Sequence, residues 1–335
     1  MSLNQSIPYG KHQISDSDID AVVSVLKSDF LTQGPRVKEF EKSFADYIGC
    51  RHAVALANGT AALHLSVLAL GLKPGERVIT TPITFSASAN CILYAGGEVE
   101  FVDIDPDVFL MDLNQLEDKL RKGGFRGVIP VDFTGLAVNM EKIRWLADRY
   151  GCWVLEDACH ASGGSFVDSK GKTVRCGNGC YADAAIFSFH PVKHIAAGEG
   201  GMVTTNRWGL AKKIELLRTH GITKKSDEMF DNHGGWYYEM QELGFNYRLS
   251  DMHAALGLNQ LERIEDGLAK RRNIANRYSR AFDGHPTIVT QKVTPTQRNE
   301  HHAYHLYVIR TDRRKKLYDH LQNQGIYVQV HYVPL

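Results

Sequence analysis

The fold is decided by a stretch that reads WVLEDACH at residues 153–160, AAIFSFHPVK at 184–193 and GEGGMVTT at 198–205. Each piece contains a short apolar run without charge, which is typical of a strand buried on both faces. Four similar runs and three helical segments come earlier in the chain: 53–57, 78–81, 99–104 and 128–131, and 60–70, 113–120 and 140–150. Strands that alternate with helices predict an α/β fold with a mostly parallel sheet, whose ligands collect beyond the carboxyl ends of the strands.

Two helices are expected before the first strand. Ser15 and Asp18 have the spacing of a capping box, so we expect the first helix to begin there. Its apolar positions predict one stripe that faces the core: Ile19, Val22, Val23 and Leu26. The second helix is predicted from Val37 to Ile48, where Gly49 ends it.

The C-terminal part of the chain has a different pattern. A single long helix is predicted from about Ser250 to Phe282. Three shorter elements follow, a strand, a helix and a strand: 304–309, 313–324 and 327–332. We therefore expect a large domain over residues 1–249 and a small α+β domain over 250–335 that is incomplete at its C-terminus.

Composition excludes several classes of protein. The 335 residues include 39 Lys and Arg against 38 Asp and Glu, so no basic field attracts nucleic acid or an anionic membrane. The most apolar run, residues 61–72, is too short to span a bilayer. With no export segment and only six scattered cysteines, we expect a cytoplasmic protein. Cys176 and Cys180 lack a second pair at zinc-site spacing, so no metal is expected.

The first candidate site opens the helix after residue 58. Gly59 lets a ligand approach the backbone, and the free N–H groups of a helix N-terminus suit a phosphate. The residues alone equally allow Asn58 or Thr60 to cap the helix without any ligand. A Walker lysine and a G-x-G-x-x-G segment are both absent, which argues against a nicotinamide oxidoreductase.

The second candidate is Asp157, which follows a buried apolar run. Because side chains alternate along a strand, Asp157 and Cys159 fall on the face opposite Glu156. A carboxylate there could hold a protonated ring nitrogen, or it could be a structural acid bonded to backbone or to His160.

The third candidate is Lys193, just past the strand at 184–189 and before a glycine-rich segment. Most lysines are surface charges, but a lysine at the ligand end of a sheet can lose solvent and form a Schiff base. Phe85 also lies beyond a strand end, where it is either core filler or a platform for a flat ring.

In their order, these segments resemble the DegT-type sugar aminotransferases over nearly the whole chain. The segments that carry the resemblance are Asn-Gly-Thr at 58–60, Phe85, Glu-Asp-x-x-His at 156–160, Ser-Phe-His-Pro-x-Lys at 188–193 and Gly-Phe-Asn-Tyr-Arg at 244–248. The family implies the fold-type I, aspartate aminotransferase-like architecture. It also implies pyridoxal 5'-phosphate as the cofactor, with pyridoxamine phosphate as an intermediate.

The resemblance implies a role for each candidate. Lys193 would form the internal aldimine and move the proton, Asp157 would pair with the ring nitrogen, and His160 would lie near the phenolic side of the ring. Phe85 would stack on the ring. The phosphate would be held by Gly59, Thr60 and Ser188 and by Asn246 of a neighbouring subunit, which implies a homodimer with shared active sites.

The same resemblance implies a sugar-nucleotide site. The residues that would line it are Tyr9, Leu31, Thr32, Gln33, Gln329, Val330, His331 and Tyr332. The chain is most similar to the branch of pseudaminic acid biosynthesis, which moves the amino group of L-glutamate to C4 of a UDP-linked 4-keto-6-deoxy-N-acetylhexosamine. Alternatives are a perosamine, 4-amino-arabinose or 3-amino-sugar transaminase and a non-catalytic sensor. A sugar 3-dehydrase would have histidine in place of Lys193.

Overall fold

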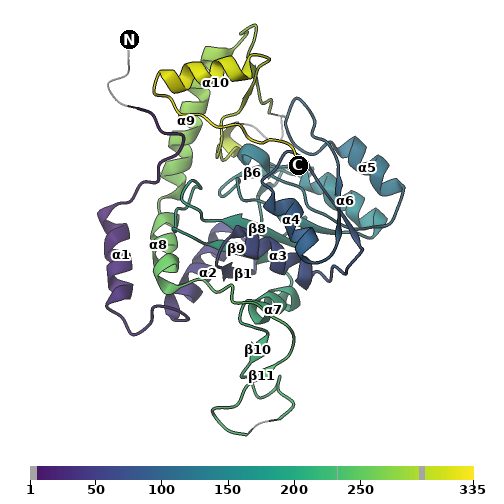
Figure 1. Cartoon of the computed structure of the whole chain (residues 1–335), viewed down its shortest axis with the longest axis vertical. Coiled ribbons are helices and arrows are strands. Elements are labelled where there is room, and N and C mark those ends of the chain that lie inside the picture. The colour runs from purple at the N-terminus through teal and green to yellow at the C-terminus, as the bar shows by residue number, and fades with distance from the viewer. Residues whose placement is uncertain (1–5, 232, 294–298) are drawn as a thin grey trace.

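The centre of the molecule is a seven-stranded sheet, seen in a computed structural model that describes residues 6–231, 233–293 and 299–335 (Figure 1). The strands lie in the order β1 (His52–Leu56), β9 (Gly201–Thr205), β8 (Ala184–Ser188), β5 (Trp153–Asp157), β4 (Phe125–Val128), β2 (Arg77–Thr80) and β3 (Glu98–Phe101). β9 is antiparallel to both its neighbours, and the pairs from β8 to β3 are parallel. The predicted α/β fold is confirmed, and a strand occurs near each of the seven predicted positions. The fourth prediction, 128–131, is displaced, because β4 ends at Val128.

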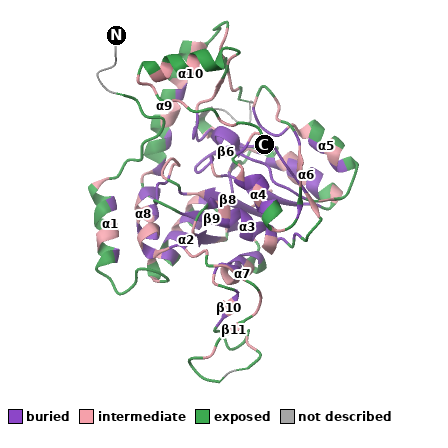
Figure 2. Cartoon of the chain, in the orientation of Figure 1, coloured by how far each residue is buried: buried purple, intermediate pink, exposed green. Residues whose placement is uncertain are grey.

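Helices cover both faces of this sheet, as the alternation of side chains requires. One buried cluster joins the sheet to α2 (Pro35–Ile48), α5 (Leu113–Arg121) and α6 (Met140–Tyr150), and the other joins it to α3 (Gly59–Ala69), α4 (Ala87–Tyr94) and α7 (Trp208–Leu217). In β5, Val154 belongs to the first cluster and Leu155 to the second. Each large apolar side chain buried in this way stabilises the fold by roughly 1.5–3 kcal/mol. Figure 2 shows the buried residues gathered in these layers.

The first helix, α1 (Asp16–Leu26), has the predicted cap but not the predicted face. Ser15 and Asp18 form both bonds of the capping box. Ile19 and Leu26 are more than half exposed, so the predicted apolar stripe is wrong. The helix instead packs on α8 (Asp251–Leu261) through the buried carboxylate of Asp18, which accepts hydrogen bonds from three side chains: Asn259, Gln260 and Arg263. A polar contact replaces the apolar one that hydrophobic periodicity predicts.

The predicted long helix is two helices, α8 and α9 (Ile264–Phe282). Between them Arg263 has a non-helical backbone, with φ −109° and ψ 7°. Its guanidinium lies 2.5 Å from the Asp18 carboxylate. Neither proline nor glycine marks this break, so the local sequence does not predict it.

The predicted C-terminal strands are largely wrong, whereas the helix is confirmed as α10 (Arg314–Asn323). In the first predicted strand, only Ile309–Arg310 (β13) pairs, with Val289–Thr290 (β12). Ala303 and Leu306 instead donate their N–H groups to Gly135 and Thr134, at distances of 2.9 and 3.2 Å. Residues 327–332, the second predicted strand, form no strand; the N–H of Tyr327 donates to the carbonyl of Ile7 at 2.9 Å, next to a single bridge between Ile326 and Ile7. Apart from β13, both segments use their backbone groups to attach to other loops rather than to a sheet.

Smaller elements complete the chain: η1 (Phe133–Gly135), β6 (Ser165–Val167), β7 (Thr173–Arg175), β10 (Ile222–Thr223), β11 (Glu239–Met240) and η2 (Asn299–His301). β10 and β11 pair in an arm that projects from the body (Figure 1). Among the described residues, no helix has the length and apolar character needed to cross a bilayer.

Candidate active site

Three segments meet where the strands end. β5 and β8 run parallel, with Asp157 opposite Ile186, so their carboxyl ends reach the same edge of the sheet. The turn after β1 joins them there. A Cβ atom placed on Gly59 would lie 3.0 Å from the Cβ of Ser188 and 3.5 Å from the Sγ of Cys159. A larger residue at position 59 would therefore push against both neighbouring segments.

The start of α3 offers donors at this meeting point. Asn58 caps the helix, because its Oδ1 accepts from the N–H of Ala61 at 2.8 Å. Gly59 and Thr60 are the first helical residues, so no carbonyl one turn earlier is available to their N–H groups. The cap predicted from the sequence is confirmed, and it leaves these two amides free for an anion.

Asp157 is buried and firmly held. Its Oδ2 accepts from the hydroxyl of Ser88 at 2.7 Å, and its Oδ1 accepts from the N–H of Cys159 at 3.2 Å. The predicted alternation is confirmed, since Glu156 points to the other side of β5. Of the bonds expected for a structural acid, the one to backbone is present, from Cys159, whereas the one to His160 is not, because both ring nitrogens of His160 have other partners.

Lys193 lies near Asp157, whose carboxylate acts on the charge of the lysine amine. We call the group of side chains around these two residues the pocket. Burial lowers the pKa of the Lys193 amine, although Cys159 and Asp157 act in the opposite direction. Its Nζ lies 3.3 Å from the Nε2 of His305. A lysine with a lowered pKa is more often the free amine, the form that attacks a carbonyl carbon.

His160 is held from two sides. The N–H of Thr134 donates to its Nδ1 at 3.3 Å, and its Nε2 lies 3.2 Å from the hydroxyl of Tyr332. Burial keeps the pKa of His160 well below its ordinary value, and the charge of Lys193 lowers it further. The ring is therefore neutral at neutral pH and acts as a polar wall of the pocket.

Several residues predicted to bind the sugar nucleotide lie next to this pocket. The hydroxyl of Tyr9 lies 2.9 Å from Nε2 of His331, and the two rings stack at 5.3 Å. Tyr332 contacts Phe85, with ring centroids 6.4 Å apart. Phe85 is 60% exposed, so its ring is not core filler and has a free face. Gln329 and Val330 are exposed in the same C-terminal segment.

Other predicted residues lie elsewhere. Thr32 makes a bridge to Ser250, and the carbonyl of Leu31 accepts from Asp251 at 3.0 Å, so this loop lies at the start of α8. Gln33 continues the loop with a φ of 58°. Asn246 is exposed and pairs with Thr219. Across residues 6–231, 233–293 and 299–335, no hydrogen bond or ring contact links these four predicted residues to Lys193.

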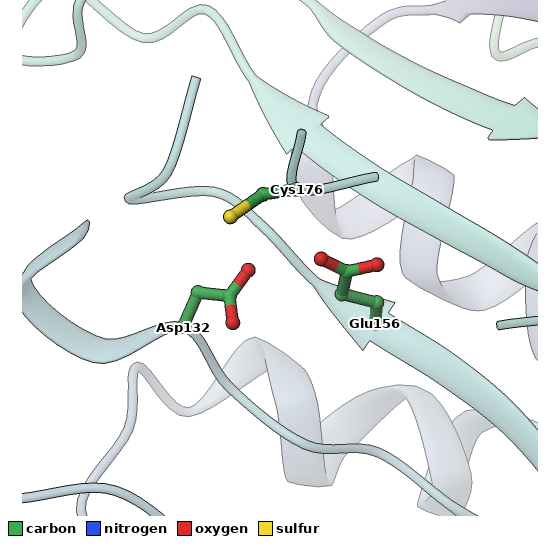
Figure 3. Close-up of side chains that lie close together, drawn as sticks. All are labelled: Asp132, Glu156 and Cys176. Carbon is green, nitrogen blue, oxygen red and sulfur yellow. The ribbon is translucent and has the colours of Figure 1, made fainter. Parts of the chain in front are cut away.

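The opposite face of β5 carries a separate buried cluster, in which Glu156 lies beside Asp132 and Cys176 (Figure 3). One ligand atom from each lies within 4.8 Å of the others. The N–H of Gly177 donates to Glu156 at 2.9 Å, and that of Val138 donates to Asp132 at 2.8 Å. Burial raises the pKa of Asp132 to about 7 and, with the charge of Asp132, raises the pKa of Glu156 well above its ordinary value. Proton retention therefore accounts for two adjacent buried acids without a cation.

Sequence reasoning missed three residues of the pocket. The hydroxyl of Ser88, to which the sequence analysis assigns no role, donates to Asp157. Thr134 and His305 were missed because they lie in segments read as connections or as a strand. The dense histidines of the segment HHAYH at 301–305 were the one available signal.

The pocket residues fit pyridoxal phosphate. The tight approach of Gly59 to Ser188 leaves room only for glycine beside the free amides of α3, as a phosphate cradle requires. The Asp157 carboxylate suits a protonated ring nitrogen. The amine of Lys193 suits an aldehyde carbon.

Comparisons with known proteins agree with this chemistry. The chain matches the sequence profile of the DegT/DnrJ/EryC1/StrS aminotransferase family over residues 12–335. It is 42% identical to a UDP-4-amino-4,6-dideoxy-N-acetyl-beta-L-altrosamine transaminase of Campylobacter jejuni, over 98% of this chain and 84% of that protein.

Solved structures give the same result. Helicobacter pylori PseC, an aminotransferase involved in the biosynthesis of pseudoaminic acid, has a TM-score of 0.86 at 31% identity and covers 98% of this chain and 85% of its own. Spr1654 of Streptococcus pneumoniae, in its PMP form, has a TM-score of 0.88 at 28% identity, with coverage of 98% and 86%. The chain belongs to the DegT/DnrJ/EryC1/StrS aminotransferase family and is a sugar aminotransferase that uses pyridoxal phosphate.

Proposed function

We propose that this enzyme moves the amino group of L-glutamate to C4 of a UDP-linked 4-keto-6-deoxy-N-acetylhexosamine. One observation carries the proposal: Lys193 and Asp157 lie at the same edge of the sheet as the close approach of Gly59 to Ser188. The choice of substrate is supported by the similarity to the Campylobacter transaminase, whose name specifies this type of sugar.

Each residue has a task in the proposed reaction. Bound pyridoxal phosphate supplies an aldehyde carbon and a ring that accepts electrons. Asp157 holds the ring nitrogen, and its bonds from Ser88 and Cys159 fix its orientation. Gly59, Thr60 and Ser188 hold the phosphate, and the free amine of Lys193 carries the proton between the reacting carbons. His160 and Phe85 confine the ring.

The sugar nucleotide is proposed to bind on the side of Tyr9, His331 and Tyr332. Their aromatic rings form a partly exposed edge beside Phe85, which suits a sugar or a base. Gln329 and Val330 extend this edge along the C-terminal segment, and the loop at residues 31–33 is proposed to approach it in the assembled enzyme.

The test is the reaction itself. The purified protein is mixed with pyridoxal phosphate, L-glutamate and the UDP-linked 4-keto sugar, and the product is identified by NMR. We expect a sugar with an amine at C4, together with 2-oxoglutarate. Lys193→Ala should form no product. A product aminated at C3, or turnover only with a dTDP- or GDP-linked sugar, would replace the proposed substrate with one of the alternatives.

We further propose that the enzyme is a homodimer in which Asn246 reaches the phosphate of the partner's site. The support is the exposed position of Asn246, away from Lys193 of its own chain. Inactive Lys193→Ala and Asn246→Ala proteins, dissociated and reassembled together, should recover about a quarter of normal activity, because half of the dimers contain one intact site. Lys193→Ala mixed with Asp157→Ala is the matched control and should recover none.

We also propose a cytoplasmic location, and the basis is the state of the cysteines. Each of the six is a free thiol in the structure, as expected in a reducing compartment. Fractionation of cells that express the full-length protein would test the location.

A further inference from the structure

We propose that His305 is a positioning residue that holds the amine of Lys193 through its Nε2 whenever the cofactor does not engage that amine. The proposal rests on the function proposed above, because it assigns a partner to the lysine of that reaction. A transaminase lysine must leave the cofactor and return within each cycle, so a fixed place for the free amine shortens its search for the reacting carbon.

The geometry supports a direct contact. The Nζ of Lys193 and the Nε2 of His305 are 3.3 Å apart, although the two residues are 112 positions apart in the chain. His305 is 8% exposed. Its ring lies 4.3 Å from that of His160, centroid to centroid, and 5.8 Å from that of His194. It therefore forms a wall of the same pocket.

The second nitrogen of His305 makes this contact adaptable. Its Nδ1 is buried and has no hydrogen-bond partner among the described residues. The tautomer of a histidine is normally fixed by the bond that its other nitrogen makes, so here the tautomer is not fixed. Nε2 can then accept a hydrogen bond from the ammonium form of Lys193 or donate one to the lone pair of the amine.

The backbone of His305 is held rigidly from several directions. Arg271 donates to the carbonyls of Tyr304 and His305 at 3.0 and 3.3 Å. The N–H of Leu306 donates to Thr134, and that of Ala303 donates to Gly135. This segment departs from the predicted strand because these contacts hold it over the pocket. The ring is consequently placed before any ligand arrives.

The charged and titratable groups around Lys193 set the direction of the expected effects. They are Asp157, Cys159, His160, His194, His305 and His331. Burial keeps the pKa of His305 well below its ordinary value, so it is a neutral partner. A neutral acceptor makes a stronger hydrogen bond with an ammonium group than with an amine, because the positive charge of the ammonium strengthens the bond. Removal of His305 should therefore lower the pKa of Lys193 further.

The experiment compares His305→Leu, which removes the polar contact, with His305→Gln, which restores an amide donor and acceptor. In the full chain without added cofactor, competitive acetylation followed by mass spectrometry measures the reactivity of Lys193 against pH. We expect His305→Leu to move the titration midpoint of Lys193 down by about one pH unit. His305→Gln should return it toward the normal value.

A second measurement uses the loaded enzyme. His305→Leu should lower kcat by about tenfold or more and leave KM for the sugar nearly unchanged, with partial rescue in His305→Gln. His302→Leu is the matched control, since His302 is buried in the same segment and bonds the N–H of Tyr304 instead of Lys193. It should lose thermal stability without moving the Lys193 midpoint.

The possible outcomes test this inference separately from the proposed aminotransferase function. An unchanged Lys193 midpoint in a folded His305→Leu protein overturns the inference, as does an equal shift in His302→Leu. If the normal protein fails to take up pyridoxal phosphate, the proposed function fails, while the acetylation result still decides whether His305 holds Lys193.

Discussion

Glu156 and Asp157 are consecutive acids at the end of one strand, yet they have opposite surroundings. Asp157 faces a pocket that contains Lys193 and accepts hydrogen bonds from Ser88 and Cys159. Glu156 faces the core, where its neighbours are a second carboxyl group and a thiol (Figure 3). The two residues are adjacent in the chain, but their side chains lie on opposite faces of the sheet.

The difference teaches that neighbours decide the chemistry of a buried acid. The carboxylate of Asp157 accepts hydrogen bonds from two fixed donors, which orient it toward a ligand. Two acids buried together without a nearby cation retain protons instead, and burial raises the pKa of each. We therefore assign cofactor binding to the face of Asp157 and a structural role to the face of Glu156.

The largest expected effect comes from Asp157→Ala. Loss of the carboxylate that we propose holds the ring nitrogen should lower turnover by about a thousandfold or more. Steady-state kinetics with the UDP-linked keto sugar measures it. Glu156→Gln is the paired variant and should keep turnover within about twofold, since amide and protonated acid have similar shape. Equal losses in both variants would erase the distinction between the two faces.

The next effect is on stability against pH. The native protein retains protons on Asp132 and Glu156 that the unfolded chain releases above pH about 4–5, because burial raises each pKa. Stability should therefore fall as pH rises from 5 toward 8, by up to about 1.4 kcal/mol per pH unit for each extra proton.

Urea unfolding at four pH values measures this slope. Glu156→Gln should flatten it and be more stable than the normal protein at pH 8. Glu98→Gln, at an exposed position on an edge strand, is the matched control and should leave the slope unchanged. A slope that persists in Glu156→Gln would contradict proton retention in this cluster.

A smaller effect is expected from Ser88→Ala. The hydroxyl of Ser88 donates to Asp157 at 2.7 Å and is fully buried, so its loss frees the carboxylate to turn. We expect turnover to fall about tenfold, the equivalent of one hydrogen bond to a charged group. Ser66→Ala is the control, because the buried hydroxyl of Ser66 has no partner in the described part of the chain. An unaltered rate in Ser88→Ala would remove its orienting role.

The smallest effect concerns the thiols. Burial raises the pKa of the Cys176 thiol well above its ordinary value, and the residue is 1% exposed. A disulfide reagent should therefore react first with exposed Cys180 and leave activity intact. Cys180→Ser should abolish the fast phase of colour release, and Cys176→Ala should not. A fast phase that depends on Cys176 would show that this face opens to solvent.

The sheet could be predicted well because the features that mark a buried strand lie within a few neighbouring residues. Buried strands such as Ala184–Ser188 are short apolar runs, and the alternation that separates Glu156 from Asp157 depends only on strand geometry. The caps at Ser15 and Asn58 were likewise predicted from nearby residues. The domain boundary at 249/250 and the individual site roles stay predictions.

What the sequence could not give depends on distant partners. Asp18 is buried against α8, whose bonding residues are more than 240 positions away. Nothing in the local sequence therefore indicates that the apolar stripe of α1 is exposed. Tyr304 has a positive φ of 46°, and its neighbours bond the η1 turn, which makes a strand-like run into a loop over the pocket. Ser88 and His305 belong to the pocket only through such tertiary contacts.

The contact between Lys193 and His305 has a consequence for biosynthesis on the ribosome. Each strand of the central sheet lies before residue 206, so the sheet can pair while later residues are still being added. The wall around the lysine, however, is supplied by residues 302–306. A nascent chain therefore has Lys193 in place long before it can shield that lysine from water. If Lys193 binds the cofactor as proposed, capture of the cofactor belongs to the last stage of maturation.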